Sequence, residues 1–172
     1  DIKSEITSVI FEYGITSIGD DAFNGCTGLT SVVIPESMTE IGHAAFYGCT
    51  ALESVTFDGC NPSVGNNVFE SCTSLKTVDL GNKFQHIGHS MFKECTNLET
   101  VSGCDALISI DSYAFYRCTA LTYITLPNTL ETIGDWAFAF NESLKTVTLG
   151  ENLEWLGGCA FFCNSALESV TF

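Results

Sequence analysis

The chain has 172 residues, of which 45% are hydrophobic, and it carries 21 acidic side chains against 6 basic ones, for a formal net charge of −15. This charge argues against nucleic-acid binding, because phosphate recognition is built on patches of Lys and Arg. No window contains the roughly eighteen uninterrupted apolar residues of a membrane span, and the N-terminus has no signal-peptide pattern. We therefore expect no membrane insertion, and either a cytosolic protein or one whose export signal was removed.

The chain opens with half a repeat, residues 1–14, and continues as seven copies with a 23-residue period to residue 172, without insertion or deletion, the last copy stopping three residues short. Phenylalanine occupies one position of every copy: Phe23, Phe46, Phe69, Phe92, Phe115, Phe138 and Phe161. Aliphatic columns that begin at Ile18, Leu29 and Val32 keep the same spacing. A fixed period of roughly 20 to 50 residues is typical of a solenoid, in which stacked copies share an elongated core. We expect one leucine-rich domain over residues 1–172, with no linker and with the phenylalanine column buried.

Each copy contains one segment that alternates polar and apolar residues and is rich in β-branched side chains, for example residues 31–34, 54–57 and 146–149. This pattern predicts a short half-buried strand, and stacking identical copies makes the strands parallel. Proline or glycine then ends the strand, as at Pro35 and Gly81. We expect eight parallel strands, starting near Ile6, Leu29, Leu52, Leu75, Leu98, Leu121, Leu144 and Leu167.

A glycine column that starts at Gly19 precedes a short A-F-x-x-C segment, which we interpret as one helical or 3₁₀ turn that aims the phenylalanine inward. The cysteine of this segment recurs as Cys26, Cys49, Cys72, Cys95 and Cys118, and is followed in register by Asn141 and Asn164. Both residue types are small and can bond to a neighbouring backbone group. A ladder of hydrogen bonds in the turn is therefore the expected role of this column.

Other roles for the nine cysteines have less support. A repeat column points its side chains in parallel, so disulfides between adjacent copies are not expected. His43 and His89 each precede a ladder cysteine by six residues, but buried thiols without a third orienting group are inert. Cys60 and Cys104 would lie roughly 10 Å apart, beyond disulfide reach, and Cys159 and Cys163 lack two further zinc ligands. We expect nine reduced thiols, a shielded ladder, and no catalytic, metal or cofactor site.

The pattern IGxxAFxxCxxLxxVxIP, present from Ile18 to Pro35 and with small departures six more times, resembles the BspA-like, or Treponema-type, leucine-rich repeat. The departures include Gly103, Asp111 and the two asparagines of the cysteine column. The resemblance implies a right-handed superhelix with one parallel β-sheet and short helical or 3₁₀ turns on the other side. It also implies a secreted or cell-surface protein of a bacterium or protist, used in adhesion or host-protein binding, with no catalytic or cofactor residues.

Two exposed surfaces are candidates for binding. The first is a ladder of hydroxyl groups on the strand face, with Thr77, Thr100, Tyr123, Thr125, Thr146 and Thr148. These residues suit any solvated strand face because they have high β-propensity. A concave partner-binding surface and an ice-binding plane are the alternatives, and Asp79 and Tyr123 interrupt the latter.

The second surface is aromatic and belongs to the fifth to seventh copies: Tyr113, Tyr116, Trp136, Phe140, Trp155 and Phe162. Apart from Tyr47, earlier copies carry small or polar residues in these columns, so the fold does not require the rings. They form either a protein-binding hot spot or a hydrophobic shield for the end of the array. We expect Trp136, Trp155 and Phe162 to be at least partly exposed or to lie in a contact between chains.

Taken as a whole, the sequence favours a non-enzymatic binding module with a protein or glycan ligand, and a purely structural spacer is the alternative. The last copy ends in an ordinary strand, with Leu167, Val170 and Phe172 at an uncapped edge. We expect the chain to be a fragment of a longer array, or to associate end to end through this edge.

Overall fold

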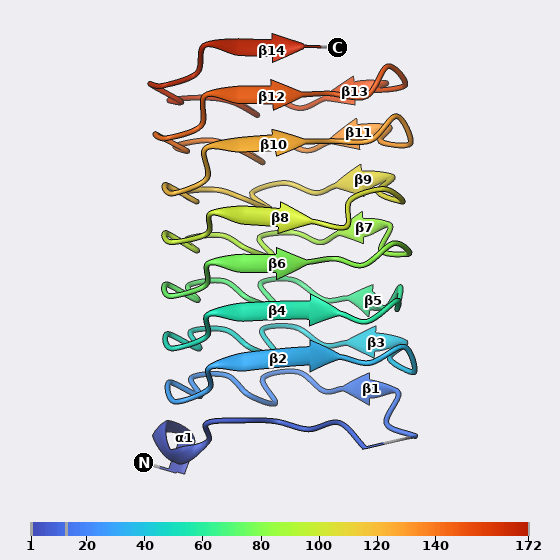
Figure 1. Ribbon diagram of the computed structural model, residues 1–172, viewed down its shortest axis with the longest axis vertical. Helices are drawn as coiled ribbons and strands as arrows, with labels where there is room; N and C mark the ends of the chain where they lie inside the picture. Colours follow the sequence, from blue (N-terminus) through green and yellow to red (C-terminus); the bar gives the residue numbers. More distant parts are fainter. Residues whose placement is uncertain (1, 13, 172) are drawn as a thin grey trace.

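The computed structural model describes residues 2–12 and 14–171. The chain winds into a stack of rungs, with its two termini at opposite ends of the long axis (Figure 1). Strands pair in parallel with partners 23 residues away, for example Val32 with Val55 and Val55 with Val78. The predicted parallel-strand solenoid is confirmed.

The longer strands form one column along the solenoid. They are β2 (Ser31–Ile34), β4 (Ser54–Phe57), β6 (Thr77–Asp79), β8 (Thr100–Ser102), β10 (Tyr123–Thr125), β12 (Thr146–Thr148) and β14 (Ser169–Thr171). The column divides between β8 and β10 into a four-stranded and a three-stranded sheet. Burial alternates along the interior strands, so that Val78 is buried between exposed Thr77 and Asp79. Seven of the eight predicted strands are therefore present.

The strand predicted near Ile6 is not formed, and this prediction is wrong. The chain begins instead with the short helix α1 (Ile2–Glu5), and residues 6–12 have no strand. Thr30 still donates its backbone N–H to the Thr7 carbonyl, at 3.3 Å. Gly28 has no room for a Cβ against the Ser4 carbonyl group, so α1 is tightly packed on the next rung. Helix α1 thus packs on the next rung in place of a strand that would pair with it through a ladder of hydrogen bonds.

A second column of short strands was not predicted. It contains β1 (Ser17–Ile18), β3 (Glu40–Ile41), β5 (Ser63–Val64), β7 (His86–Ile87), β9 (Ser109–Ile110), β11 (Thr132–Ile133) and β13 (Trp155–Leu156). These strands pair as two sheets, β1-β3-β5 and β13-β11-β9-β7. The solenoid therefore has two strand columns where a single sheet was expected.

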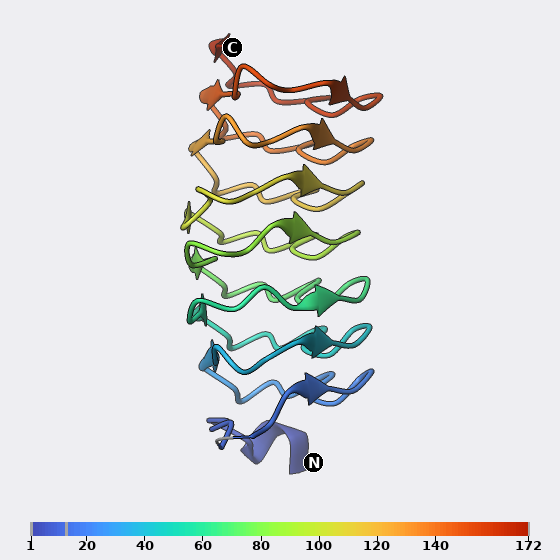
Figure 2. The same cartoon turned by 90° about the vertical axis from the view of Figure 1, so that its right-hand side faces the viewer.

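The A-F-x-x-C segments are hydrogen-bonded turns, whereas a helical or 3₁₀ turn was expected. Within one rung Cys26 donates its N–H to the Phe23 carbonyl at 3.0 Å, while the Phe23 N–H reaches the Ala45 carbonyl of the next rung at 2.7 Å. Gly25 has φ of 72°, the left-handed value typical of the third residue of a type II turn. A residue with a left-handed φ interrupts a helix. In these turns, every second N–H group points to a carbonyl of the next rung, along the solenoid axis. In Figure 2 the long strands follow the left side and the turns lie toward the right.

The phenylalanine column fills the core, as predicted. Phe46 and Phe69 are fully buried, with ring centroids 5.1 Å apart and an interplanar angle of 7°. Phe23 and Phe161, on the outer rungs, are partly buried. The stack is continuous from Phe23 to Phe161 along the solenoid.

The cysteine ladder has the predicted hydrogen bonds. The Cys72 thiol donates to the Phe46 carbonyl at 3.2 Å, and Cys95 and Cys118 repeat this contact one rung later each time. All nine cysteines are free, and seven of them are buried. Asn141 departs from the ladder, because its buried side-chain nitrogen and oxygen have no partner within the described residues. Its backbone N–H donates to Asn164 Oδ1 at 2.7 Å.

At the last rung Leu167 is half-buried and Val170 is 36% exposed. Phe172, the third residue of the predicted apolar edge, lies outside the described residues. Association through this edge stays a prediction.

Candidate binding surface

The described part of the chain contains no group of three or more His, Cys, Asp or Glu residues placed to hold a metal ion. None of its helices is long and apolar enough to cross a membrane. The surfaces that remain as candidates are the aromatic side chains, the strand face and the hollows next to them.

Five aromatic side chains on the turns of neighbouring rungs are in continuous ring contact, and we call them the aromatic cluster: Tyr113, Tyr116, Trp136, Phe140 and Phe162. Tyr113 and Trp136 are near-parallel, with centroids 6.3 Å apart and an interplanar angle of 3°. Phe162 packs edge-on against both Trp136, at 5.4 Å, and Phe140, at 5.6 Å. Tyr116 makes edge contacts with Tyr113 and Phe140. The rings thus hold one another in place across three rungs.

The exposure predicted for Trp136, Phe162 and Trp155 is confirmed. Phe162 is 47% exposed, Trp136 is half-buried, and Trp155 is 62% exposed. Trp155 lies in β13, however, and makes no ring contact with the cluster. The structure therefore brings together five of the six predicted aromatic residues and leaves Trp155 apart.

The backbone beneath the cluster is unfavourable for large side chains. Tyr113, Trp136 and Phe140 have φ of 61°, 58° and 60°, a left-handed conformation that costs an L-residue about 1 to 2 kcal/mol. Gly25 and Gly48 occupy the column of Phe140 in earlier copies with φ of 72° and 65°. Phe140 keeps this conformation because its N–H donates to the Phe162 carbonyl at 2.8 Å. Other copies keep the same left-handed φ at these positions with small or charged residues such as Ala44 and Glu94, so the fold does not require rings there.

Arg117 belongs to the same surface and was missed in the sequence. Its guanidinium carbon lies 5.8 Å from the ring centroid of Tyr116 and 5.7 Å from that of Phe140, close enough for cation–π attraction. Arg117 occupies the same column as Phe140, one rung earlier. Two features of the sequence could have identified Arg117: it shares a column with Phe140, and it directly follows Tyr116.

A polar hollow of about 550 Å³ lies beside the cluster. It is lined by Asn67, His89, Ser90, Lys93, Glu94, Tyr113, Tyr116 and Arg117. Lys93 donates to Glu70 Oε1 at 2.8 Å, and this bond raises the pKa of the Lys93 ammonium group. The His89 ring packs edge-on against Tyr113 at 5.8 Å. The hollow therefore combines cationic groups, hydrogen-bonding groups and aromatic ring edges.

The strand face is a row of hydroxyl groups without comparable clustering. Thr77, Thr125, Thr146 and Thr148 are exposed, Tyr123 is 55% exposed, and Thr100 is half-buried. The strands that carry these residues pair in register, with Tyr123 opposite Thr146 and Thr125 opposite Thr148. Both a solvated sheet and a partner-binding face remain compatible with this arrangement.

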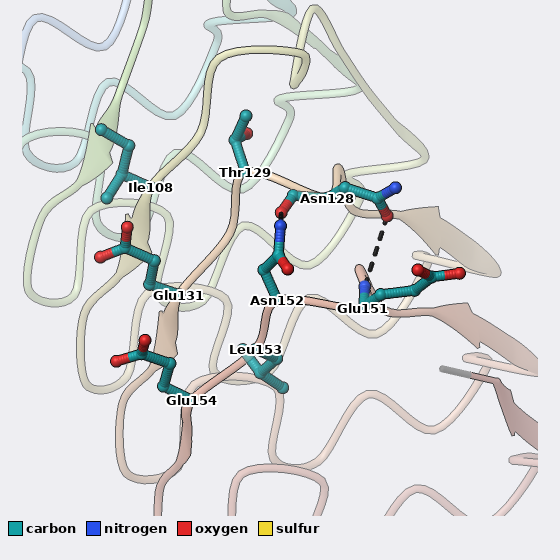
Figure 3. A pocket seen from close by; sticks show the side chains of 8 residues that line it. All are labelled: Ile108, Asn128, Thr129, Glu131, Glu151, Asn152, Leu153 and Glu154. Carbon is teal, nitrogen blue, oxygen red and sulfur yellow. Dashed lines mark hydrogen bonds between the residues drawn. The ribbon is translucent and has the colours of Figure 1, made fainter.

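A third site is an acidic hollow of about 550 Å³ at the corner between the long and short strands (Figure 3). Asn152 Nδ2 donates to the Asn128 carbonyl at 2.9 Å, and the Glu151 N–H donates to Asn128 Oδ1 at 3.3 Å. Glu131 and Glu154 occupy one column on adjacent rungs, with their carboxylates on the same side of the chain (Figure 3). The bonds of Asn128 join successive rungs, which explains this corner as a structural turn.

Stacked rungs with parallel strands, a phenylalanine core and hydrogen-bonded turns define a repeat solenoid of the leucine-rich-repeat class. The family model described as "BspA type Leucine rich repeat region", with 6 copies, matches residues 2–121 and 97–172. The chain therefore belongs to the BspA-type leucine-rich repeat family. No curated protein sequence matches it.

Several solved structures are similar. A leucine-rich repeat protein from Bacteroides ovatus is 32% identical, with a TM-score of 0.88 over 94% of this chain and 41% of its own. The Treponema pallidum leucine-rich repeat protein is 25% identical, with a TM-score of 0.77 over 94% of this chain and 78% of its own. The pneumococcal vaccine antigen PcpA, at 21% identity and a TM-score of 0.54, shares the fold. The chain thus spans less than half the length of the Bacteroides ovatus protein.

Proposed function

We propose that this chain is a non-enzymatic binding module of a secreted or cell-surface protein, and that the aromatic cluster contacts its partner. The family is typical of protein–protein interaction and surface proteins. The observation that carries the proposal is the group of five contacting rings in the last three copies, at turn positions that the earlier copies fill mostly with small or polar side chains.

The composition of the cluster matches that of an interface hot spot. Trp, Tyr and Arg dominate the binding energy of most protein interfaces, and Trp136, Tyr113, Tyr116 and Arg117 lie together here. Mutual ring contacts already restrict the side chains, so less conformational entropy is lost on binding. An exposed apolar ring such as Phe162, rimmed by polar groups, also fits an interaction site.

The test compares cluster variants with a matched control. Trp136→Gly and Phe162→Ala remove rings from the cluster, whereas Trp155→Ala removes an exposed ring outside it. An array of extracellular-matrix proteins and glycans is probed with each chain, and saturable binding is measured by biolayer interferometry. We expect the two cluster variants to lose binding and Trp155→Ala to keep it.

A saturable ligand that binds all three variants equally would place the site elsewhere, and Thr125→Ala and Thr148→Ala would then test the strand face. If the parent chain has no saturable ligand on the array, the structural spacer becomes the better account.

A further inference from the structure

Arg117 is a cation without a carboxylate partner in a strongly acidic chain. The chain has 21 acidic and 6 basic side chains. Ion pairs join three of the bases to glutamates: Lys76 to Glu53, Lys83 to Glu36 and Lys93 to Glu70. Over residues 2–12 and 14–171, Arg117 makes no ion pair, and no protein group accepts a hydrogen bond from its guanidinium. Its donors are therefore available to a ligand.

The aromatic rings hold this cation ready for a planar anion. Tyr116 and Phe140 both lie within 6 Å of the guanidinium, and the cation–π contacts with these two rings restrain it. A guanidinium presents its N–H groups as a rigid fork that matches the two oxygens of a carboxylate. Because the fork is already ordered, less side-chain entropy is lost when the anion binds.

The polar hollow next to Arg117 has the chemistry that a sugar requires. Its volume of about 550 Å³ is within the range of small-ligand sites. Lys93 and Asn67 each already donate one hydrogen bond to Glu70 and have further N–H groups to offer. Glu94 supplies an acceptor, and Tyr113 and Tyr116 supply aromatic edges. Sugar hydroxyls need donors and acceptors in alternation, and the C–H groups of the ring pack on aromatic surface.

The backbone around the hollow is not free to bind an extended peptide. The Ser90 N–H donates to the Ser112 carbonyl at 3.1 Å, and the Glu94 N–H donates to the Tyr116 carbonyl at 2.8 Å. Arg117 likewise donates its N–H to the Ala139 carbonyl at 3.0 Å. A peptide that binds by strand addition needs an open edge of backbone groups, and these groups are used between rungs. Binding by strand addition is therefore excluded at these groups, and side chains must contact the ligand here.

We propose that the polar hollow binds an acidic sugar, with the sugar carboxylate paired to Arg117 and its hydroxyl groups bonded to Asn67, Lys93 and Glu94. The proposal rests on the proposed function, because it names the ligand chemistry of the same surface. It applies to uronic acids and to other pyranoses that carry a carboxylate.

The experiment uses methyl glucuronide and methyl galacturonide as probes, with methyl glucoside and methyl galactoside as neutral controls. Binding is followed by two-dimensional NMR of the Arg117 side-chain N–H and of the Trp136 indole. Arg117→Gly suits the φ of 61° at this position and keeps the fold, and Arg117→Lys keeps the charge without the planar fork. Lys145→Ala removes an exposed base elsewhere and is the matched control.

We expect the uronides to shift both signals and the neutral glycosides to bind at least about tenfold more weakly, as for loss of a charge-assisted hydrogen bond. Arg117→Gly loses uronide binding, Arg117→Lys weakens it, and Lys145→Ala retains it. Equal binding of neutral and acidic sugars would overturn the role of the carboxylate.

Binding of a short acidic peptide in place of the uronides would show a protein ligand and overturn the sugar proposal. If no sugar binds while a protein partner still depends on Trp136 and Phe162, the sugar proposal fails and the proposed function stands. If every cluster variant still binds the partner, the proposed function is contradicted instead.

Discussion

Within one turn, the fold needs some side chains and only accommodates others. The residues at the left-handed positions belong to the second group. Phe138 is fully buried in the phenylalanine column, whereas Phe140, two residues later, is half-buried at φ of 60°. Both are phenylalanines of the same turn, but only Phe140 sits where glycine is the better residue. Their replacement should therefore have different effects on stability.

Phe92→Ala or Phe138→Ala should lower the free energy of unfolding by about 3 to 5 kcal/mol, because each leaves a cavity in the core. Phe140→Gly should change it by less than about 1 kcal/mol, since relief of the left-handed strain offsets the lost ring contacts. Urea denaturation followed by circular dichroism measures both. A Phe140→Gly loss as large as that of Phe138→Ala would mean that the cluster is part of the core.

The cysteines should divide into two reactivity classes. Cys159 and Cys163 are exposed, and the other seven are buried. Burial raises the pKa of the Cys60 thiol to about 11 and that of Cys104 to about 11, so both hold their protons at pH 8. Titration of the native chain with Ellman's reagent at pH 8 should count two fast thiols, and nine after denaturation. Fewer than nine without added reductant would reveal disulfides.

Asn141 is the weak position of the cysteine ladder. Its buried amide has no side-chain partner among the described residues, whereas Cys118 one rung earlier bonds to the Phe92 carbonyl. Asn141→Cys should restore the ladder and raise the free energy of unfolding by about 1 to 3 kcal/mol, the cost of a buried unpaired polar group. Chemical denaturation of the variant, with the exposed Asn82→Cys as control, checks this. Unchanged stability would mean that the Asn141 amide is satisfied in solution.

At the scale of the elements, the long strands were predictable and the short ones were not. In strands such as β4, polar and apolar residues alternate over four positions, and β-branched side chains recur at these positions in every copy. Strands such as β3 contain two residues, too few for an alternating pattern to appear. Their Ile41 column was read correctly as core, but a single buried residue does not distinguish a strand from a turn.

The turn segments misled the prediction because a left-handed φ leaves little trace in the sequence. Gly25 and Gly48 mark the position in the first copies, but Ser71, Glu94 and Arg117 occupy it later. These residues are compatible with a helix by propensity alone. The contacts between rungs determine their conformation, and such contacts are not visible in one copy.

The candidate surface was predictable in its composition and not in its arrangement. Departures from the repeat pattern located five contacting rings correctly. Trp155 lies apart from the aromatic cluster because its column belongs to the short strand β13, and the sequence does not show which side of the rung this column faces. The role of Arg117 depends on contacts with Tyr116 and Phe140 that only the fold creates.

For the whole molecule, the net charge of −15 should oppose compact stacking, because 21 acids repel one another along the array. Salt shortens the Debye length from about 30 Å at 0.01 M to about 8 Å at 0.15 M and screens this repulsion. The midpoint of thermal unfolding should therefore rise with NaCl over this range. Sucrose at equal osmolality is the control, and a midpoint that falls with NaCl would show that attractive ion pairs dominate.

The bonds between rungs run along the long axis of the molecule, and this direction decides how the chain bears mechanical tension. When the two termini are pulled apart, the rungs are loaded in series and bear the same force. The outermost rung, which has a neighbour on one side only, should therefore yield first while the rest stay folded. Each rung releases 23 residues, which lengthens the chain by roughly 70 to 80 Å. Force spectroscopy should record a regular series of small, equal steps. The molecule would then act as an extensible tether that keeps a bound partner attached while the force is absorbed rung by rung.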